Sequence, residues 1–318
     1  MTLTNNPAFA VCLMLAGFAA AAVWYGFRLK KEHLPARAAL AAAAAGALLA
    51  LVCAKAGYLL HDMGANLFEG YFDEVTAFDP AMFSFVAGAA GFSAGVAVSA
   101  RISGIRPMKA LDLFAAPGCA FIFLARIAEG GMDTIGIGGE VTAEWLRFFP
   151  LAMKDSWGDA YLAVFVLEAL WALVCLVPAL QGRKTESREG DTFRRTAVWL
   201  LGTQIGFEML LTYPYIRSFY TSFVSLEQIL CAILFMVIAV CGCRRNRNWK
   251  PVIASVALLL LSMLFQFYRD NKIGIIFEEG WEWALDNKEA ISRTMFLLIS
   301  VGLILAGERS IRLRKGKM

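Results

Sequence analysis

Three ionisable side chains interrupt an apolar run in the middle of the chain: Asp112, Arg126 and Glu129. An ionisable group in hydrocarbon costs roughly 2.5–3.5 kcal/mol or more, so such residues usually face a bundle interior and mark a substrate or ion path. On a helix, Asp112 and Arg126 lie ~21 Å apart along the axis, whereas Arg126 and Glu129 share a face and can pair. The run therefore predicts an Arg–Glu pair at one end of a helix and an aspartate at the other.

A simpler interpretation of the same residues stays open. Asp112 would cap the inner end of the helix, and Arg126 and Glu129 would lie at the outer water boundary. Pro117, between them, removes one backbone donor and tends to kink a helix, which frees a carbonyl to face an interior site.

Other polar residues are embedded in apolar runs. Gln204 and Glu208 are one helical turn apart and so share a face, for which a functional site and a packing contact are both open. Glu168 and Glu227 each stand alone among apolar neighbours, which favours a packing contact or a boundary position. The ionisable residues in or at the ends of the first seven runs are Lys55, Asp112, Arg126, Glu129, Glu168, Glu208, Glu227 and, at an outer end, Arg217.

The composition is that of a membrane protein, with 59% hydrophobic and 18% charged residues among 318. Nine apolar runs are each near the ~20 residues that a spanning helix needs, and a lipid-exposed chain must satisfy its own backbone hydrogen bonds. We therefore expect an all-α, polytopic helical membrane protein with about nine transmembrane helices. The runs are 7–27, 36–60, 81–100, 110–128, 160–180, 196–216, 223–242, 252–267 and 291–306.

The loop charges predict the orientation. Five alternate segments hold 21 of the 30 lysines and arginines, and the positive-inside rule makes them cytoplasmic. The N-terminus is then outside and the C-terminus inside. The net charge of +4 reflects the inner loops and favours an anionic lipid surface, not nucleic acid. With two histidines in the chain we expect no multi-histidine metal site, and no cofactor is indicated.

Several short motifs recur in a fixed order between residues 54 and 240. They are AKAGYLL with Lys55 and Tyr58, SFVAGAAG from Ser84, Asp112 with Ala116-Pro117 and then Arg126, Tyr161, GFEMLL around Glu208, and the SLEQ segment that ends in Gln228. Together they resemble the motifs of the bacterial prolipoprotein diacylglyceryl transferases, seven-helix enzymes of the cytoplasmic (inner) membrane. The resemblance implies a transferase-like membrane core at 1–250, followed at 251–318 by two additional helices and a basic cytoplasmic tail.

Such enzymes transfer the diacylglyceryl group of phosphatidylglycerol to the cysteine thiol of a lipobox-containing secreted precursor. The resemblance implies that Arg126 holds the lipid phosphate, a task that suits a guanidinium with paired donors. The roles implied are phosphate binding for Arg126, Lys55 and Arg217, catalysis for Glu129, Glu208 and Asp112, and support for Tyr58, Gln204, Gln228 and Tyr161.

The chain departs from the family pattern at several positions. Val86 stands at the family's histidine, Gln204 at an arginine, Glu129 at an asparagine and Leu162 at a glutamate. A thiol with a pKa near ~8.5 needs a base or a field that lowers that pKa, so a catalytic chain would use Glu129 or Glu208 as the base. Two alternatives stay open: a non-catalytic lipid-binding or assembly protein on the same scaffold, and a small transporter.

Overall fold

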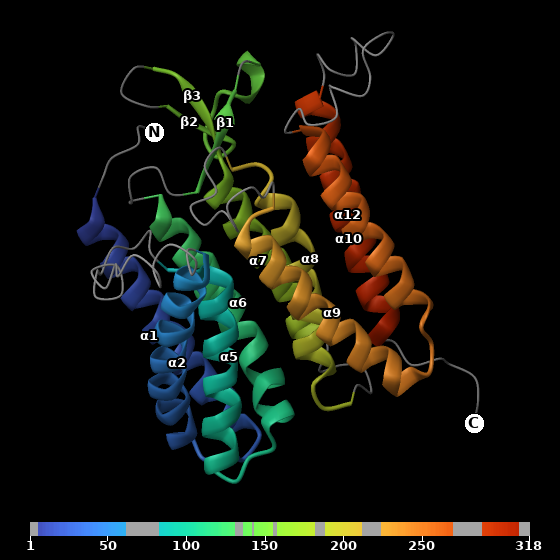
Figure 1. Ribbon diagram of the computed structural model, residues 1–318. Coiled ribbons are helices and arrows are strands. Elements are labelled where there is room, and N and C mark those ends of the chain that lie inside the picture. Colours follow the sequence, from blue (N-terminus) through green and yellow to red (C-terminus); the bar gives the residue numbers. More distant parts are fainter. Residues whose placement is uncertain are drawn as a thin grey trace, which may run out of the picture. The chain divides into compact units, whose positions relative to one another are not determined.

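The computed structural model describes residues 6–61, 83–130, 136–141, 143–154, 158–181, 188–211, 224–269 and 288–311. Within these ranges the chain forms nine α-helices, a short 3-10 helix and three strands (Figure 1). Eight of these helices are long and apolar enough to cross a membrane. The chain is therefore a helical, multi-pass membrane protein, as the composition predicts.

The chain divides into two compact units. The first unit comprises Met1–Thr196 with Leu211–Tyr215, and the second comprises Ala197–Leu210 with Ile216–Met318. The helices that lie wholly in the first unit are α1 (Pro7–Lys31), α2 (Arg37–His61), α5 (Phe85–Ile102), α6 (Pro107–Glu129) and α7 (Val164–Gln181).

In the first unit, α2 packs on α5, α1 packs on α6, and α6 packs on α7. Glycines allow the backbones of α2 and α5 to approach directly. A Cβ atom added at Gly95 would lie 2.5 Å from the Cα atom of Gly46 and 2.6 Å from the carbonyl oxygen of Ala45. Small residues at such a crossing are typical of helices that associate by van der Waals packing in lipid.

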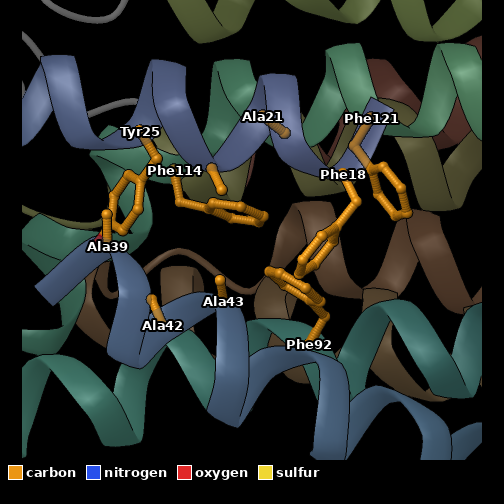
Figure 2. A pocket seen from close by; sticks show the side chains of 10 residues that line it. Phe18, Ala21, Tyr25, Ala39, Ala42, Ala43, Phe92, Phe114 and Phe121 are labelled. Atoms are coloured by element: carbon orange, nitrogen blue, oxygen red, sulfur yellow. The ribbon is translucent and has the colours of Figure 1, made fainter. Parts of the chain in front are cut away.

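An aromatic cluster fills the space between α1, α2, α5 and α6 (Figure 2). The rings of Phe92 and Phe114 stack at 5.1 Å, and Phe18 meets Phe92 and Phe121 edge-on at 6.0 and 6.1 Å. The hollow that remains has a volume of about 10 Å³ and is lined only by aromatic and alanine side chains. Because a water molecule needs ~10–15 Å³ and polar partners, this hollow belongs to the packed core and is no lipid cavity.

A small antiparallel sheet lies between α6 and α7 in the sequence. Its strands are β1 (Ile137–Glu140), β2 (Ala152–Lys154) and β3 (Ala160–Ala163), in the order β1-β3-β2, and the 3-10 helix η2 (Glu144–Leu146) follows β1. This corrects the prediction that the whole of 160–180 is helix, since its first four residues form the central strand. Both neighbours of β3 satisfy its backbone hydrogen-bonding groups, so helix α7 begins only at Val164.

The helices of the second unit are α9 (Leu226–Asn246), α10 (Lys250–Arg269) and α12 (Lys288–Ile311), together with most of α8 (Asp191–Phe207). Helix α12 packs on α10 and on α9. It also lies close to α8, where a Cβ atom at Gly202 would be 3.3 Å from the side chain of Ile304. These contacts explain why the two compact units divide within α8.

Helix α8 is shorter than the apolar run at 196–216 predicts. It ends at Phe207, residues 208–210 form a turn, and α8 is not among the eight candidate spans. The helix begins earlier than the run, at Asp191, and its first turns carry Arg194 and Arg195, which lower its apolar character. Hydropathy therefore located this element but misjudged both of its ends.

Candidate functional site

Arg126 lies buried in the last turn of α6 and meets two carboxylates. Its Nη1 atom donates to both carboxylate oxygens of Glu129, at 2.8 and 2.9 Å, and its Nε atom lies 3.1 Å from Oε2 of Glu168 on α7. The guanidinium carbon stands 3.7 Å from the ring centroid of Phe85 on α5, a cation–π contact. Three helices thus position one guanidinium, and the predicted Arg126–Glu129 pair is confirmed.

The two carboxylates around Arg126 are not equivalent. The Glu129 side chain is 15% exposed and ends α6, whereas the Glu168 side chain is 4% exposed and belongs to the first half of α7. Glu168 therefore holds Arg126 from the interior, and Glu129 is the partner nearer to solvent. Removing one member of a buried ion pair typically costs about 3–5 kcal/mol, because the remaining charge is left uncompensated.

A second cation lies against the start of the same helix α5. The Nζ atom of Lys55, on α2, is 5.2 Å from the ring centroids of both Tyr58 and Phe83. Ser84, the next residue, caps α5 by accepting from the backbone N–H of Ala87 at 3.1 Å, and its own N–H donates to the carbonyl of Ala54 on α2 at 3.0 Å. The segment at the start of α5 is thereby fixed to α2.

Phe83 contacts Lys55 and Phe85 contacts Arg126, so one three-residue segment touches both cations. We call Lys55, Arg126, Glu129 and Glu168, together with the segment 83–85, the Arg126 site. Its two cations and two carboxylates balance in formal charge. The helix N-terminus of α5 adds partial positive charge at this end of the bundle. The structure thus gathers Lys55, Tyr58, Arg126 and Glu129, four of the residues predicted from the sequence.

The small sheet begins against the Arg126 site. Gly136, just before β1, has a φ of +71°, and its carbonyl accepts from the N–H of Phe165 at 3.0 Å. A Cβ atom at Gly136 would lie 3.5 Å from Oε2 of Glu129, which shows how closely the sheet approaches this carboxylate. Tyr161 is in the central strand, paired with Glu140 and Met153, and is therefore part of the sheet framework.

Asp112 lies at the opposite end of α6 from Arg126, ~21 Å away along the helix axis. Its Oδ2 atom accepts from the backbone N–H of Gly190 at 2.5 Å, and its Oδ1 atom accepts from that of Phe193 at 2.8 Å. These are N–H groups at the N-terminus of α8, which has no intrahelical partner for them. Asp112 is thus a cap, as the simpler interpretation held, but it caps α8 and not its own helix.

A polar network joins α8 and α9 in the second unit. Buried Glu208 accepts from the amide of Gln204 at 3.3 Å and from the hydroxyl of Ser225 at 3.1 Å. Ser225 is the N-cap of α9 in a reciprocal capping box with Gln228. The Gln228 amide also donates to the carbonyl of Ile205 at 3.3 Å. The predicted proximity of Gln204 and Glu208 is confirmed, although Glu208 lies in the turn just after α8, and Gln228 acts as a helix cap.

Sequence reasoning missed the role of Glu168, which it treated as a packing contact or boundary residue. The sequence did contain an indication: a lone carboxylate in an apolar helix has a high free-energy cost unless a buried cation pairs with it. Arg217 lies outside the described residues. In the part of the chain that the structure describes, no group of three or more His, Cys, Asp or Glu side chains could hold a metal ion.

A scan against protein-family models finds no match to this chain, and searches among curated proteins and among solved structures find none. The resemblance to the diacylglyceryl transferases therefore rests on the sequence motifs alone and remains a prediction.

Proposed function

We propose that the chain is a membrane lipid-modifying transferase that binds an anionic phospholipid, phosphatidylglycerol in the first instance, at the Arg126 site. The observation that carries the proposal is that Phe83 and Phe85 hold Lys55 and Arg126 at the end of one helix, beside the partly exposed carboxylate of Glu129. Two cations and a helix N-terminus are the groups that a lipid phosphate needs.

The proposed reaction transfers a diacylglyceryl group to a thiol of a secreted precursor. The sulfur attacks the glyceryl carbon, the bond from that carbon to the phosphate oxygen breaks, and glycerol phosphate leaves. The thiol proton passes to Glu129. Preorganised donors stabilise the charge that develops on the departing phosphate most strongly in a water-poor site, and Arg126 supplies them.

In this proposal the phosphate exchanges places with Glu129 on Arg126. Glu168 is almost fully buried and pairs with the Nε atom, whereas Nη1 donates to the more exposed Glu129. Displacement of Glu129 by a phosphate frees a carboxylate at the moment when the acceptor thiol needs a base.

The proposal includes the orientation and location expected from the loop charges. The N-terminus is outside, nine segments cross a bacterial cytoplasmic membrane, and the Arg126 site faces outward. The last turn of α1 carries Arg28, Lys30 and Lys31, and α5 ends beside Arg101, so basic residues gather at the helix ends that the proposal places inside.

A second candidate function is a non-catalytic lipid-binding or assembly protein. One observation favours it: Arg126 is already engaged by two carboxylates, and a phosphate must displace one of them. Val86 at the family's histidine position removes a base that the transferases possess.

Purified protein incubated with labelled phosphatidylglycerol and a lipobox peptide tests the proposal. A transferase releases glycerol phosphate and forms a thioether-linked peptide. Arg126→Lys keeps the charge but loses the paired donors, so we expect turnover and phospholipid retention in native mass spectra to fall. Arg188→Ala, in the predicted inner loop, is the control and should change neither.

The outcomes separate the two functions. If wild-type protein retains phospholipid through Arg126 but forms no thioether with any anionic phospholipid, the scaffold function replaces the transferase. If Arg126→Lys and Arg188→Ala retain the same amount of lipid as the wild type, Arg126 does not bind the headgroup and both functions lose their site.

A further inference from the structure

Three large aromatic side chains project from the segment that links β1 and β2. Trp145 in η2 is 75% exposed, and Phe148 and Phe149, which follow it, are 54% and 48% exposed. We call these three residues the aromatic ridge. The sheet does not use them for its own core, which consists of Val141, Ala152 and Ala160 with Leu146 and Leu162 packed against it.

Backbone hydrogen bonds tie Phe148 of the aromatic ridge to the residue that precedes a candidate membrane span. The carbonyl of Phe148 accepts from the N–H groups of Leu151 and Ala152, both at 2.9 Å, and the carbonyl of Leu151 accepts from the N–H of Ala163 at 2.9 Å. Helix α7 begins at the next residue, Val164. The backbone of Phe148 is therefore within about two strand spacings, ~10 Å, of the helix end.

That distance corresponds to a particular depth in a bilayer. The hydrocarbon core is ~30 Å thick and the bilayer with its headgroup regions is ~40–45 Å, so each headgroup layer is only ~5–8 Å deep. A side chain that starts within ~10 Å of a helix end at this boundary needs to bridge only a few ångströms to reach back into the headgroup layer. Tryptophan and other aromatic residues concentrate there, because their rings are apolar and the indole N–H can be hydrated.

We propose that the aromatic ridge docks on the phospholipid surface of the bilayer and holds the small sheet against it. Arg147, between the aromatic residues, fits this partner. Its Nε atom donates to the carbonyl of Val141 at 2.8 Å, which orients the side chain, and the exposed guanidinium has further donors for lipid phosphates. The inference rests on the helices spanning a bilayer and not on the transferase reaction.

The docking has a consequence for the Arg126 site. The sheet that carries the ridge begins at Gly136, whose backbone bonds to Phe165 and approaches Glu129. A ridge seated in the headgroup layer fixes this end of the sheet, and with it the surroundings of the carboxylate. The lipid surface is thereby an additional support for the site.

Photo-crosslinking of the full chain in nanodiscs of phosphatidylglycerol and phosphatidylethanolamine tests the inference. With benzoylphenylalanine in place of Phe148, we expect phospholipid adducts in the mass spectrum. The same probe in place of Lys154 is the matched control. Lys154 is exposed and pairs with Ala160, at the end of β3 away from α7 and ~13 Å along the strand from the helix end, so it should give less adduct.

A second measurement uses a conservative substitution that keeps an aromatic ring at each position of the ridge. Subtracting the fluorescence spectrum of Trp145→Phe from that of the wild type gives the emission of Trp145 alone. Lipids brominated near the headgroup should quench this emission at least twofold more than lipids brominated at the chain end. Adducts to a second protein chain, or a difference signal that iodide quenches and brominated lipids do not, would overturn the inference. A protein without transferase activity should still give the lipid adducts, so the two proposals fail separately.

Discussion

Replacement of Asp112 by asparagine should destabilise the protein. Its two carboxylate oxygens accept from the backbone N–H groups of Gly190 and Phe193 at 2.5 and 2.8 Å. Asparagine keeps one acceptor oxygen and turns an NH₂ group toward the other N–H. A hydrogen bond to a charged group contributes about 1.5–3 kcal/mol, so we expect a loss of about 2 kcal/mol. For domains of 150–250 residues this lowers the unfolding midpoint by ~4–8 °C.

Thermal unfolding in detergent and hydrogen exchange check this value. Amides in the first turns of α8, from Gly190 onward, should exchange faster in Asp112→Asn, because the helix N-terminus has lost a cap. Asp191→Asn is the control. Asp191 accepts from the N–H of Arg188 at 3.3 Å and from Arg194 at 3.4 Å, longer bonds that should contribute about 1 kcal/mol or less. An unchanged midpoint and unchanged protection in Asp112→Asn would refute the capping role.

Three further predictions concern packing, catalysis and orientation. Gly95→Ala places a Cβ atom against the α2 backbone and should cost about 3 kcal/mol or more of unfolding free energy. Gly88→Ala places its Cβ atom 3.2 Å from the Ala54 side chain and 3.6 Å from the Ala50 carbonyl oxygen, an ordinary contact, and should cost about 1 kcal/mol; equal losses would argue against the close crossing. If the chain is a transferase, Glu129→Gln should lower turnover ~100-fold or more while keeping the side-chain shape, and near-wild-type turnover would exclude it as the base. A cysteine probe near Asp73, outside the described residues, should react with an impermeant reagent from outside and one near Arg188 should not; the reverse labelling would invert the topology.

Hydropathy and local residue spacing, both read from the sequence, predicted the membrane helices and the contacts between residues one turn apart. Apolar runs near 20 residues long located the membrane helices, because a spanning helix must satisfy its own backbone and match the hydrocarbon thickness. The three-residue spacing of Arg126 and Glu129, and the four-residue spacing of Gln204 and Glu208, placed each pair on one helix face. These relations link residues one helical turn apart in the sequence, so they can be predicted without knowing how the helices pack.

Tertiary structure decided the contacts between elements. Glu168 became the interior partner of Arg126 only because α7 packs on α6, and Asp112 became a cap only because the start of α8 lies beside the second turn of α6. Strand β3 replaced the first turn of an expected helix because two neighbouring strands satisfy its backbone hydrogen bonds. Each outcome depends on groups distant in the sequence, and local hydropathy and spacing do not indicate which distant group will be in contact.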